Sequence, residues 1–184
     1  PGETLEAKYS NLRAAYGYMM THPGKKLLFM GQDFGQAHEW NEKVQLDWWE
    51  CDNPLNKDLQ DFVRDLLHIY KKFPAMYALD DSWDGFEWVN ADDRERSIFS
   101  FIRKDSTGKN ALLFVINFTP VERDDYMVGV PNAGTYSLVL NEHGLVTEKK
   151  SLRAKKGECD GKKYHISYPL PAYGCAVFKF NYNK

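Results

Sequence analysis

Polar and aromatic side chains that could hold a ligand gather between residues 31 and 50. Residues 31–40 read GQDFGQAHEW, and residues 46–50 read LDWWE. Carboxylates and amides hydrogen-bond to hydroxyl groups, and aromatic rings stack on the apolar C–H faces of sugars. The alternative is structural: Asp33 caps a local turn and Trp40 packs the loop onto its neighbours. From the residues alone, the structural interpretation is favoured for both.

Metal chemistry is not indicated by the acidic and histidine residues. His38 and Glu39 resemble the start of an HExxH zinc motif, but Glu42 stands where the second histidine is required. Asp124 and Asp125 are too few for calcium, which takes six to eight oxygen ligands. The sequence therefore predicts neither a metal nor another cofactor.

Composition restricts the partners and the compartment. The net charge of -2 gives no electrostatic reason to expect nucleic acid or an anionic membrane as partner. Cys51, Cys159 and Cys175 show no CxxC spacing, so we expect neither a disulfide framework nor a zinc knuckle, and a reducing cytoplasm fits best. No export signal or membrane-spanning run is recognised. The initial Pro1 suggests a piece of a longer protein.

Two helices that flank a short strand are predicted in the first part of the chain. The first covers Leu5–Met20, and its apolar stripe consists of Leu5, Tyr9, Leu12, Tyr16 and Met19. KLLFM, ending at Met30, reads as a strand buried on both sides, and the polar loop Gln32–Asp52 follows it. Asn53 and Pro54 then predict the start of a second helix, which ends by Phe73 and Pro74. Its apolar positions are Leu59, Phe62, Val63, Leu66, Leu67 and Tyr70.

After about residue 80 the pattern becomes that of an antiparallel β-sandwich. Six strands are predicted at 97–104, 111–118, 126–130, 135–141, 164–170 and 174–180. Turns are expected at 105–108 and 131–134, a solvated turn at 94–96, and a mobile surface loop at 154–163. Trp83, Trp88 and Tyr126 could form a sugar-binding platform, but we expect them to be buried in the core or at a sheet edge.

The predicted fold class is an α/β remnant followed by an all-β antiparallel sandwich. A single parallel strand between two helices lacks the neighbouring strands that its backbone requires, and a complete (β/α)₈ barrel takes about 250 residues. About the first 75 residues therefore hold one strand of a parallel sheet without the sheet, and the remainder holds a complete small β domain.

The sequence resembles the C-terminal part of bacterial 1,4-α-glucan (glycogen) branching enzymes, which belong to the α-amylase clan. The resemblance rests on five stretches and covers nearly the whole chain, being weakest at 142–163. These stretches are NLRAAYGYMMTHPGKKLLFMGQDFGQAHEWN (11–41), LDWWE (46–50), LQDFVRDLLHIYKKFPAM (59–76), GFEWVNADD (85–93) and INFTPVERDDYMVGV (116–130).

The resemblance implies a retaining transglycosylation in glycogen biosynthesis, which cleaves α-1,4 and forms α-1,6 linkages. That mechanism needs a carboxylate nucleophile and a carboxylic general acid about 5 to 5.5 Å apart. In the family both belong to motifs upstream of this region, so no catalytic residue is carried over and the chain alone is expected to be inactive.

In the intact enzyme, the loop after the last barrel strand is expected to contact the substrate, an α-1,4-glucan. The candidate substrate-binding residues are Asp33, Gln36, Glu39, Trp40 and Trp48. The resemblance also implies that residues 1–78 are the last helix, strand and helix of the (β/α)₈ barrel and that residues 79–184 are the C-terminal sandwich. The remainder of the barrel is the other implied partner. Two alternatives stay open: a non-catalytic glucan-binding or structural module, and the same region of another enzyme of the clan.

Overall fold

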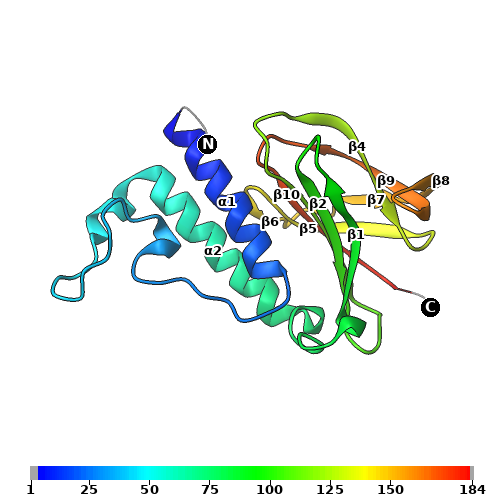
Figure 1. Cartoon of the computed structure of the whole chain (residues 1–184), viewed down its shortest axis with the longest axis horizontal. Helices are drawn as coiled ribbons and strands as arrows, with labels where there is room; N and C mark the ends of the chain where they lie inside the picture. Colours follow the sequence, from blue (N-terminus) through cyan, green and yellow to red (C-terminus); the bar gives the residue numbers. More distant parts are fainter. Residues whose placement is uncertain (1–3, 183–184) are drawn as a thin grey trace.

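The computed structural model describes residues 4–182 (Figure 1). Helix α1 (Leu5–Thr21) and helix α2 (Pro54–Lys72) precede all the strands of this part of the chain. The loop between the helices contains two short 3₁₀ helices, η1 (Gln32–Phe34) and η2 (Trp48–Asp52). Both predicted helices are confirmed. No helix of the described residues is long and apolar enough to cross a membrane.

Both helices begin at side-chain caps. The Thr4 hydroxyl accepts a hydrogen bond from the backbone N–H of Ala7, and the Asn53 side chain accepts one from Leu55. Pro54 follows Asn53 in the first turn of α2, where its missing N–H has no helical partner to lose. The cap that the sequence indicated for α2 is therefore present.

The buried face of α1 differs from the predicted stripe. Leu5 is 52% exposed, and the fully buried positions are Ala14, Gly17, Met20 and Thr21. Small residues face inward because the helix approaches the sheet closely: a Cβ on Gly17 would lie 2.8 Å from the Cys175 sulfur. In α2 the predicted stripe is largely correct, although Leu67 is 44% exposed and Ile69 is buried instead.

The remaining chain forms ten strands, all paired antiparallel. The strands are β1 (Phe86–Asp93), β2 (Ile98–Arg103), β3 (Ala111–Asn117), β4 (Arg123–Val130), β5 (Thr135–Asn141), β6 (Gly144–Leu145), β7 (Ser151–Arg153), β8 (Lys155–Cys159), β9 (Lys162–Leu170) and β10 (Cys175–Phe180). Two more 3₁₀ helices, η3 (Pro74–Met76) and η4 (Trp83–Gly85), connect α2 to β1. All six predicted strands are present.

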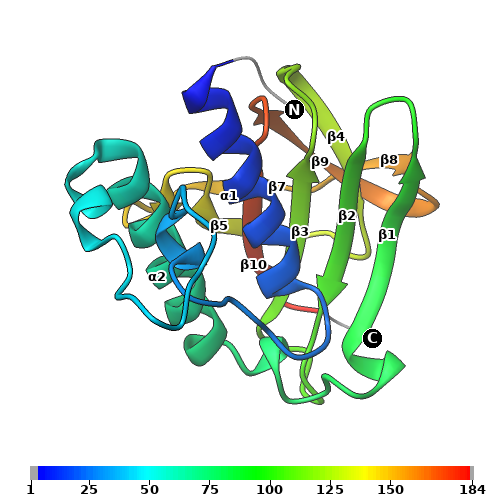
Figure 2. The same ribbon diagram turned by 60° about the vertical axis from the view of Figure 1, so that its left-hand side comes forward.

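The elements form three layers. The larger sheet has the order β1-β2-β3-β10-β5-β6, with β7 also paired to β5, and the smaller sheet has the order β4-β9-β8. Figure 2 shows α1 and α2 on one face of the larger sheet, while β4, β8 and β9 lie on its other side. The larger sheet is therefore covered on both faces.

Strand β3 contributes side chains both to the interface with the helices and to the interface between the two sheets. All its residues are buried. Leu112, Phe114 and Ile116 join the apolar cluster that includes the helices. Leu113 and Val115, which alternate with them, join the cluster between the two sheets. Since successive side chains of a strand point to opposite faces, a continuous apolar run fits a strand buried on both sides.

Two sequence predictions about backbone structure are wrong. Residues 26–30, expected to form a buried strand, have no strand pairing within the described chain, and Leu27 is 73% exposed. The apolar run is there, but the neighbouring strands that would satisfy its backbone are not. Residues 154–163, expected to be a mobile loop, form β8, the turn at Asp160 and Gly161, and the start of β9.

Candidate functional site

The loop from residue 31 to residue 50 begins with two glycines that the backbone requires. Gly31 and Gly35 flank η1 and have φ angles of 85° and 69°, in the left-handed region where a Cβ is strained. A Cβ on Gly31 would also lie 2.9 Å from the Gln36 side chain. Side chains of α1 secure the turn, because the Tyr16 hydroxyl donates to the Gln32 carbonyl at 2.7 Å.

A buried pair of polar side chains holds the two halves of the loop together. Glu50 and Asn56 are 6% and 5% exposed. The Glu50 carboxylate accepts a hydrogen bond from the Ala37 backbone N–H at 3.0 Å, and the Asn56 amide donates to the Phe34 carbonyl at 2.9 Å. Buried polar groups are costly unless they are paired, so these contacts fix the loop to the start of α2.

Gln36 and Asp47 add a second connection nearer the solvent. The Gln36 side chain donates to the His38 carbonyl at 3.1 Å and accepts from the Asp47 backbone N–H at 2.9 Å. The imidazole of His38 contacts the Asp47 carboxylate at 2.8 Å, which raises the pKa of His38 above its ordinary value. Gln36, predicted as a substrate contact, thus has its amide engaged within the loop.

Three tryptophans leave much of their surface open on this loop. Trp40, Trp48 and Trp49 are 47%, 54% and 66% exposed. The Trp40 ring packs edge-on against Phe29 with centroids 5.1 Å apart, and Trp48 packs against the buried Phe34 at 5.4 Å. One side of each of these two rings is thereby held, which gives the rigid aromatic surface on which a sugar could stack.

The five predicted substrate-binding residues do not line one common cavity. Asp33 lines a cavity of about 400 Å³ between residues 26–30 and α2. Glu39 is exposed beside Trp40 at the outer part of the loop. Trp40 and Trp48 are held by different partners, as described above. The loop is therefore an open surface rather than an enclosed active site.

His38, Asp47 and Glu50 form the one metal-sized group among the described residues, with ligand atoms within 4.8 Å of one another. Sequence reasoning missed this grouping because His38 and Asp47 are nine positions apart and meet only when the loop folds back. Their contacts already have a hydrogen-bonding explanation: His38 pairs with Asp47, and Glu50 is held by Ala37 and Asn56. No metal chemistry is assigned to them.

Acidic residues also surround a cavity of about 310 Å³ beside α1 and α2. Asp58, Asp61 and Glu142 line it together with Arg13 and His143. Burial lowers the pKa of the Arg13 guanidinium, and the charges of Asp58 and Glu142 oppose that shift. Asp61 is paired with Lys57 and Arg64 on the surface of α2. The acids thus accompany cations rather than forming an isolated catalytic pair.

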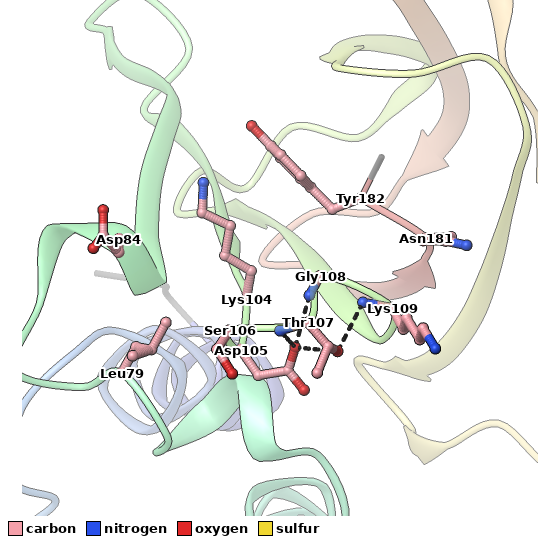
Figure 3. Close-up of a pocket in the computed structure, with 10 residues that line it drawn as sticks. All are labelled: Leu79, Asp84, Lys104, Asp105, Ser106, Thr107, Gly108, Lys109, Asn181 and Tyr182. Atoms are coloured by element: carbon pink, nitrogen blue, oxygen red, sulfur yellow. Dashed lines mark hydrogen bonds between the residues drawn. The ribbon is translucent and has the colours of Figure 1, made fainter. Parts of the chain in front are cut away.

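A third cavity, of about 610 Å³, lies where the β2–β3 turn meets the C-terminal segment (Figure 3). The Asp105 carboxylate accepts hydrogen bonds from the N–H groups of Thr107 and Gly108, which confirms the predicted turn. Lys104 lies over the Tyr182 ring, 4.4 Å from its centroid. Because these polar groups contact one another, the cavity is explained as the place where the β2–β3 turn and the C-terminal segment meet.

The three aromatic residues considered as a platform have three different environments. Tyr126 is buried, as expected, and Trp88 is half-buried. Trp83 is 83% exposed, so the expectation that it is buried is wrong. It lies on η4, directly before β1. The sequence around Trp83 has no periodicity that would indicate its exposure.

Comparison with known proteins identifies relatives of both the sheet part and the helical part. The family described as alpha amylase, C-terminal all-beta domain, matches residues 88–181. The chain is 51% identical over 191 residues to the 1,4-alpha-glucan branching enzyme of Butyrivibrio fibrisolvens and 41% identical over 185 residues to that of Geobacillus stearothermophilus. All of this chain is covered in the first case and 97% in the second. The chain spans only 30% and 29% of the length of these two relatives.

Solved structures share the fold at low sequence identity. A type I pullulanase from Bacillus subtilis, complexed with maltose, has a TM-score of 0.71 at 16% identity and covers 99% of this chain and 25% of its own. AmyP in complex with maltose has a TM-score of 0.62 at 16% identity, with 96% of this chain and 35% of its own covered. At these identities the likeness establishes the fold alone.

Proposed function

Because the chain belongs to the family of the α-amylase C-terminal all-β domain, we propose that it is the C-terminal part of a 1,4-α-glucan branching enzyme. The observation that carries the proposal is the similarity to the Butyrivibrio fibrisolvens enzyme, which extends over the whole chain, helices and loop included. The activity proposed for the whole protein is cleavage of α-1,4 linkages and formation of α-1,6 linkages in glycogen biosynthesis.

The catalytic carboxylates of the proposed reaction belong to the part of the enzyme that precedes this chain. A retaining mechanism needs a general acid whose pKa is raised. Here the pKa of Asp61 is lowered, chiefly by the hydrogen bond from Lys57. Burial alone would raise the pKa of Glu87, but hydrogen bonds from Lys162 and Tyr182 outweigh it and lower the pKa. Both shifts oppose a role of these two carboxyl groups as general acid.

Residues 1–78 are proposed as the end of the catalytic barrel, and residues 79–184 as the sandwich that follows it. Residues 26–30 would become the last barrel strand once upstream strands pair with them. Their exposed apolar side chains support this role, since Leu27 is 73% and Phe29 46% exposed. Contiguous apolar surface of this kind usually marks a place where another part of a protein binds.

In the intact enzyme, the loop of residues 31–50 is proposed to contact the glucan at the rim of the barrel. Trp40 and Trp48 offer exposed rings for stacking, and Asp33 and Glu39 offer carboxylates as hydrogen-bond acceptors. Gln36 is proposed to act mainly by positioning, because its amide already connects His38 to Asp47.

The proposal is tested by replacing the corresponding C-terminal 30% of the Butyrivibrio fibrisolvens enzyme with this chain. The chimera should convert amylose to a product with new α-1,6 linkages and weaker iodine staining. This chain alone, incubated in parallel, should produce none. A soluble, folded chimera without branching activity would contradict the assignment, and turnover by the isolated chain would contradict the location of the carboxylates.

A non-catalytic glucan-binding module is the second candidate. The observation that favours it is the open surface of Trp40, Trp48, Trp49 and Trp83. An inactive chimera together with maltoheptaose binding by the isolated chain would favour this candidate over the first.

A further inference from the structure

A cup of aromatic and acidic side chains lies at the end of α1, next to the start of β1. His22, Asp80, Asp81, Trp83, Phe86 and Trp88 line a cavity of about 370 Å³, and we call it the Trp83 cup. Figures 1 and 2 both show the end of α1 beside the start of β1, and the His22 and Phe86 rings are 5.2 Å apart. Cavities from about 300 Å³ upward are large enough for small ligands.

The rings of the Trp83 cup form a bent surface rather than a flat one. Phe86 is the buried floor, and Trp83 and Trp88 lie at 57° and 85° to it, with centroids 6.3 and 5.0 Å away. Trp83 is 83% exposed, the largest exposure among the large apolar side chains of the described chain. A tryptophan that is open to water costs hydrophobic free energy, which a ligand on its face would recover.

The cup is held in shape by a buried arginine. Arg103 is fully buried and donates to the Thr21 carbonyl, the Met76 carbonyl and the Asp80 carboxylate, each at 2.7 to 2.9 Å. These bonds connect the end of α1, η3 and the strand β2. Gly85 lies so close to Leu79 that a Cβ would be 2.4 Å from its carbonyl oxygen. The backbone behind the cup is therefore fixed before any ligand arrives, which lowers the cost of binding.

The polar groups of the Trp83 cup disfavour an anionic ligand. Asp80 is engaged by Arg103 and by the Gly24 N–H, whereas Asp81 is exposed and available as an acceptor. Burial lowers the pKa of His22, which favours the neutral form of its ring. Acidic groups repel phosphates and other anions, while aromatic faces and carboxylate acceptors together suit a sugar.

We infer that the Trp83 cup binds a chain of α-1,4-linked glucose, at a place separate from the loop of residues 31–50. The choice of sugar rests on the proposed function. The bent arrangement of the rings supports it, because successive glucose units turn relative to one another in α-1,4 chains, whereas β-1,4 chains are flat ribbons. In the whole enzyme the cup would hold a glucan chain without taking part in the reaction.

The test is calorimetric titration of this chain with maltoheptaose and with cellohexaose. Maltoheptaose should bind and cellohexaose should bind at least about tenfold more weakly, a difference of about 1.4 kcal/mol. Trp83→Ala should weaken maltoheptaose binding by about tenfold or more, and Trp83→Phe should retain most of it. Because Trp83 is so exposed, its replacement should leave the fold intact, which circular dichroism checks.

Matched controls separate the cup from other aromatic surfaces. Tyr77→Ala removes an aromatic side chain that is 44% exposed and packs against Tyr70, outside the cup. It should change the affinity by less than about twofold. Equal binding by wild type and Trp83→Ala, or equal affinity for the two sugars, would overturn the inference.

Failure of this inference differs from failure of the proposed function. If the chimera branches amylose while the Trp83 cup binds no maltoheptaose, only the inference is wrong. If the chimera is inactive while Trp83-dependent binding persists, the cup remains a glucan site and the branching assignment is wrong.

Discussion

At the scale of single residues, Arg103 has the most consequential position in the molecule. Burial lowers the pKa of its guanidinium, and the hydrogen bond and charge of Asp80 oppose that shift. The side chain is 0% exposed and that of Asp80 is 21% exposed, so the pair is partly shielded from water. Removing one partner of such a pair leaves the other polar groups without compensation.

Arg103→Ala should lower the free energy of unfolding by about 3 to 5 kcal/mol, because three acceptors lose their donor in a buried place. Urea denaturation followed by circular dichroism measures the change. The control is Arg94→Ala, whose side chain is 86% exposed in the solvated turn and should cost less than about 0.5 kcal/mol. Equal effects of the two variants would contradict the role given to Arg103.

The contact of His38 with Asp47 predicts a pH dependence in the loop. Because Asp47 raises the pKa of His38 in the folded chain, the contact is fully stabilising below the unfolded pKa, about 6.5, and is lost as pH rises through the higher folded value. NMR titration of the His38 ring should show a midpoint above 6.5. Asp47→Asn should return the midpoint toward the ordinary value, and an unchanged midpoint would exclude the contact in solution.

At the scale of elements, the packing of α1 depends on a residue that usually weakens helices. Gly17 is buried, and a Cβ there would lie 2.8 Å from the sulfur and 3.4 Å from the Cβ of Cys175 on β10. Glycine in a helix costs about 1 kcal/mol relative to alanine. In α1 this cost is offset, because the absence of a Cβ at Gly17 allows the helix to lie close to the sheet.

Gly17→Ala should therefore destabilise the chain by about 1 to 2 kcal/mol, against the gain that helix propensity alone would give. In the Cys175→Ala background the sulfur is absent, and the same substitution should cost about 1 kcal/mol less. Thermal or urea unfolding of the four proteins in this double-mutant cycle measures the coupling. Purely additive effects would show that the two residues do not touch.

Much of the element structure could be predicted from periodicity, and the exceptions have physical reasons. Helical spacing in α2 and the apolar runs of β3 and β10 are strong local signals. Strand β8 was missed because its lysine-rich segment carries no apolar alternation and is defined by pairing with β9. Residues 26–30 have the composition of a strand, but a strand also requires partners, which a local pattern does not reveal.

The candidate site was less predictable than the fold. The residue types of the loop indicated where aromatic and acidic groups gather, and Trp40 and Trp48 are indeed exposed there. The roles of Glu50 and Asn56 as buried anchors depend on contacts between the loop and α2. The Trp83 cup joins residues some 60 positions apart, from His22 to Asp81, and only the tertiary fold brings them together.

At the scale of the whole molecule, the exposed segment of residues 26–30 should matter for assembly with the rest of the enzyme but not for the stability of this chain. Leu27→Lys should leave the stability of this chain unchanged within about 0.5 kcal/mol, because the side chain is already 73% exposed. In the branching-enzyme chimera the same substitution would place a charge among the proposed barrel strands, so activity or soluble yield should fall.

Unfolding curves of the isolated chain and branching assays of the chimera measure the two effects. Val121→Lys, at a position 48% exposed in the connection between β3 and β4, is the control and should affect neither. A fully active Leu27→Lys chimera would argue against residues 26–30 as the last barrel strand.

The double covering of the larger sheet has a consequence for how the protein can be divided. Its inner strands contribute side chains to the helices on one side and to β4 and β9 on the other. Cutting the chain after residue 78 would uncover an aromatic and aliphatic face that includes Phe101 and Phe114, and such a surface promotes aggregation. Shortened chains that retain the sandwich should therefore begin before α1, so that both helices continue to cover this face of the larger sheet.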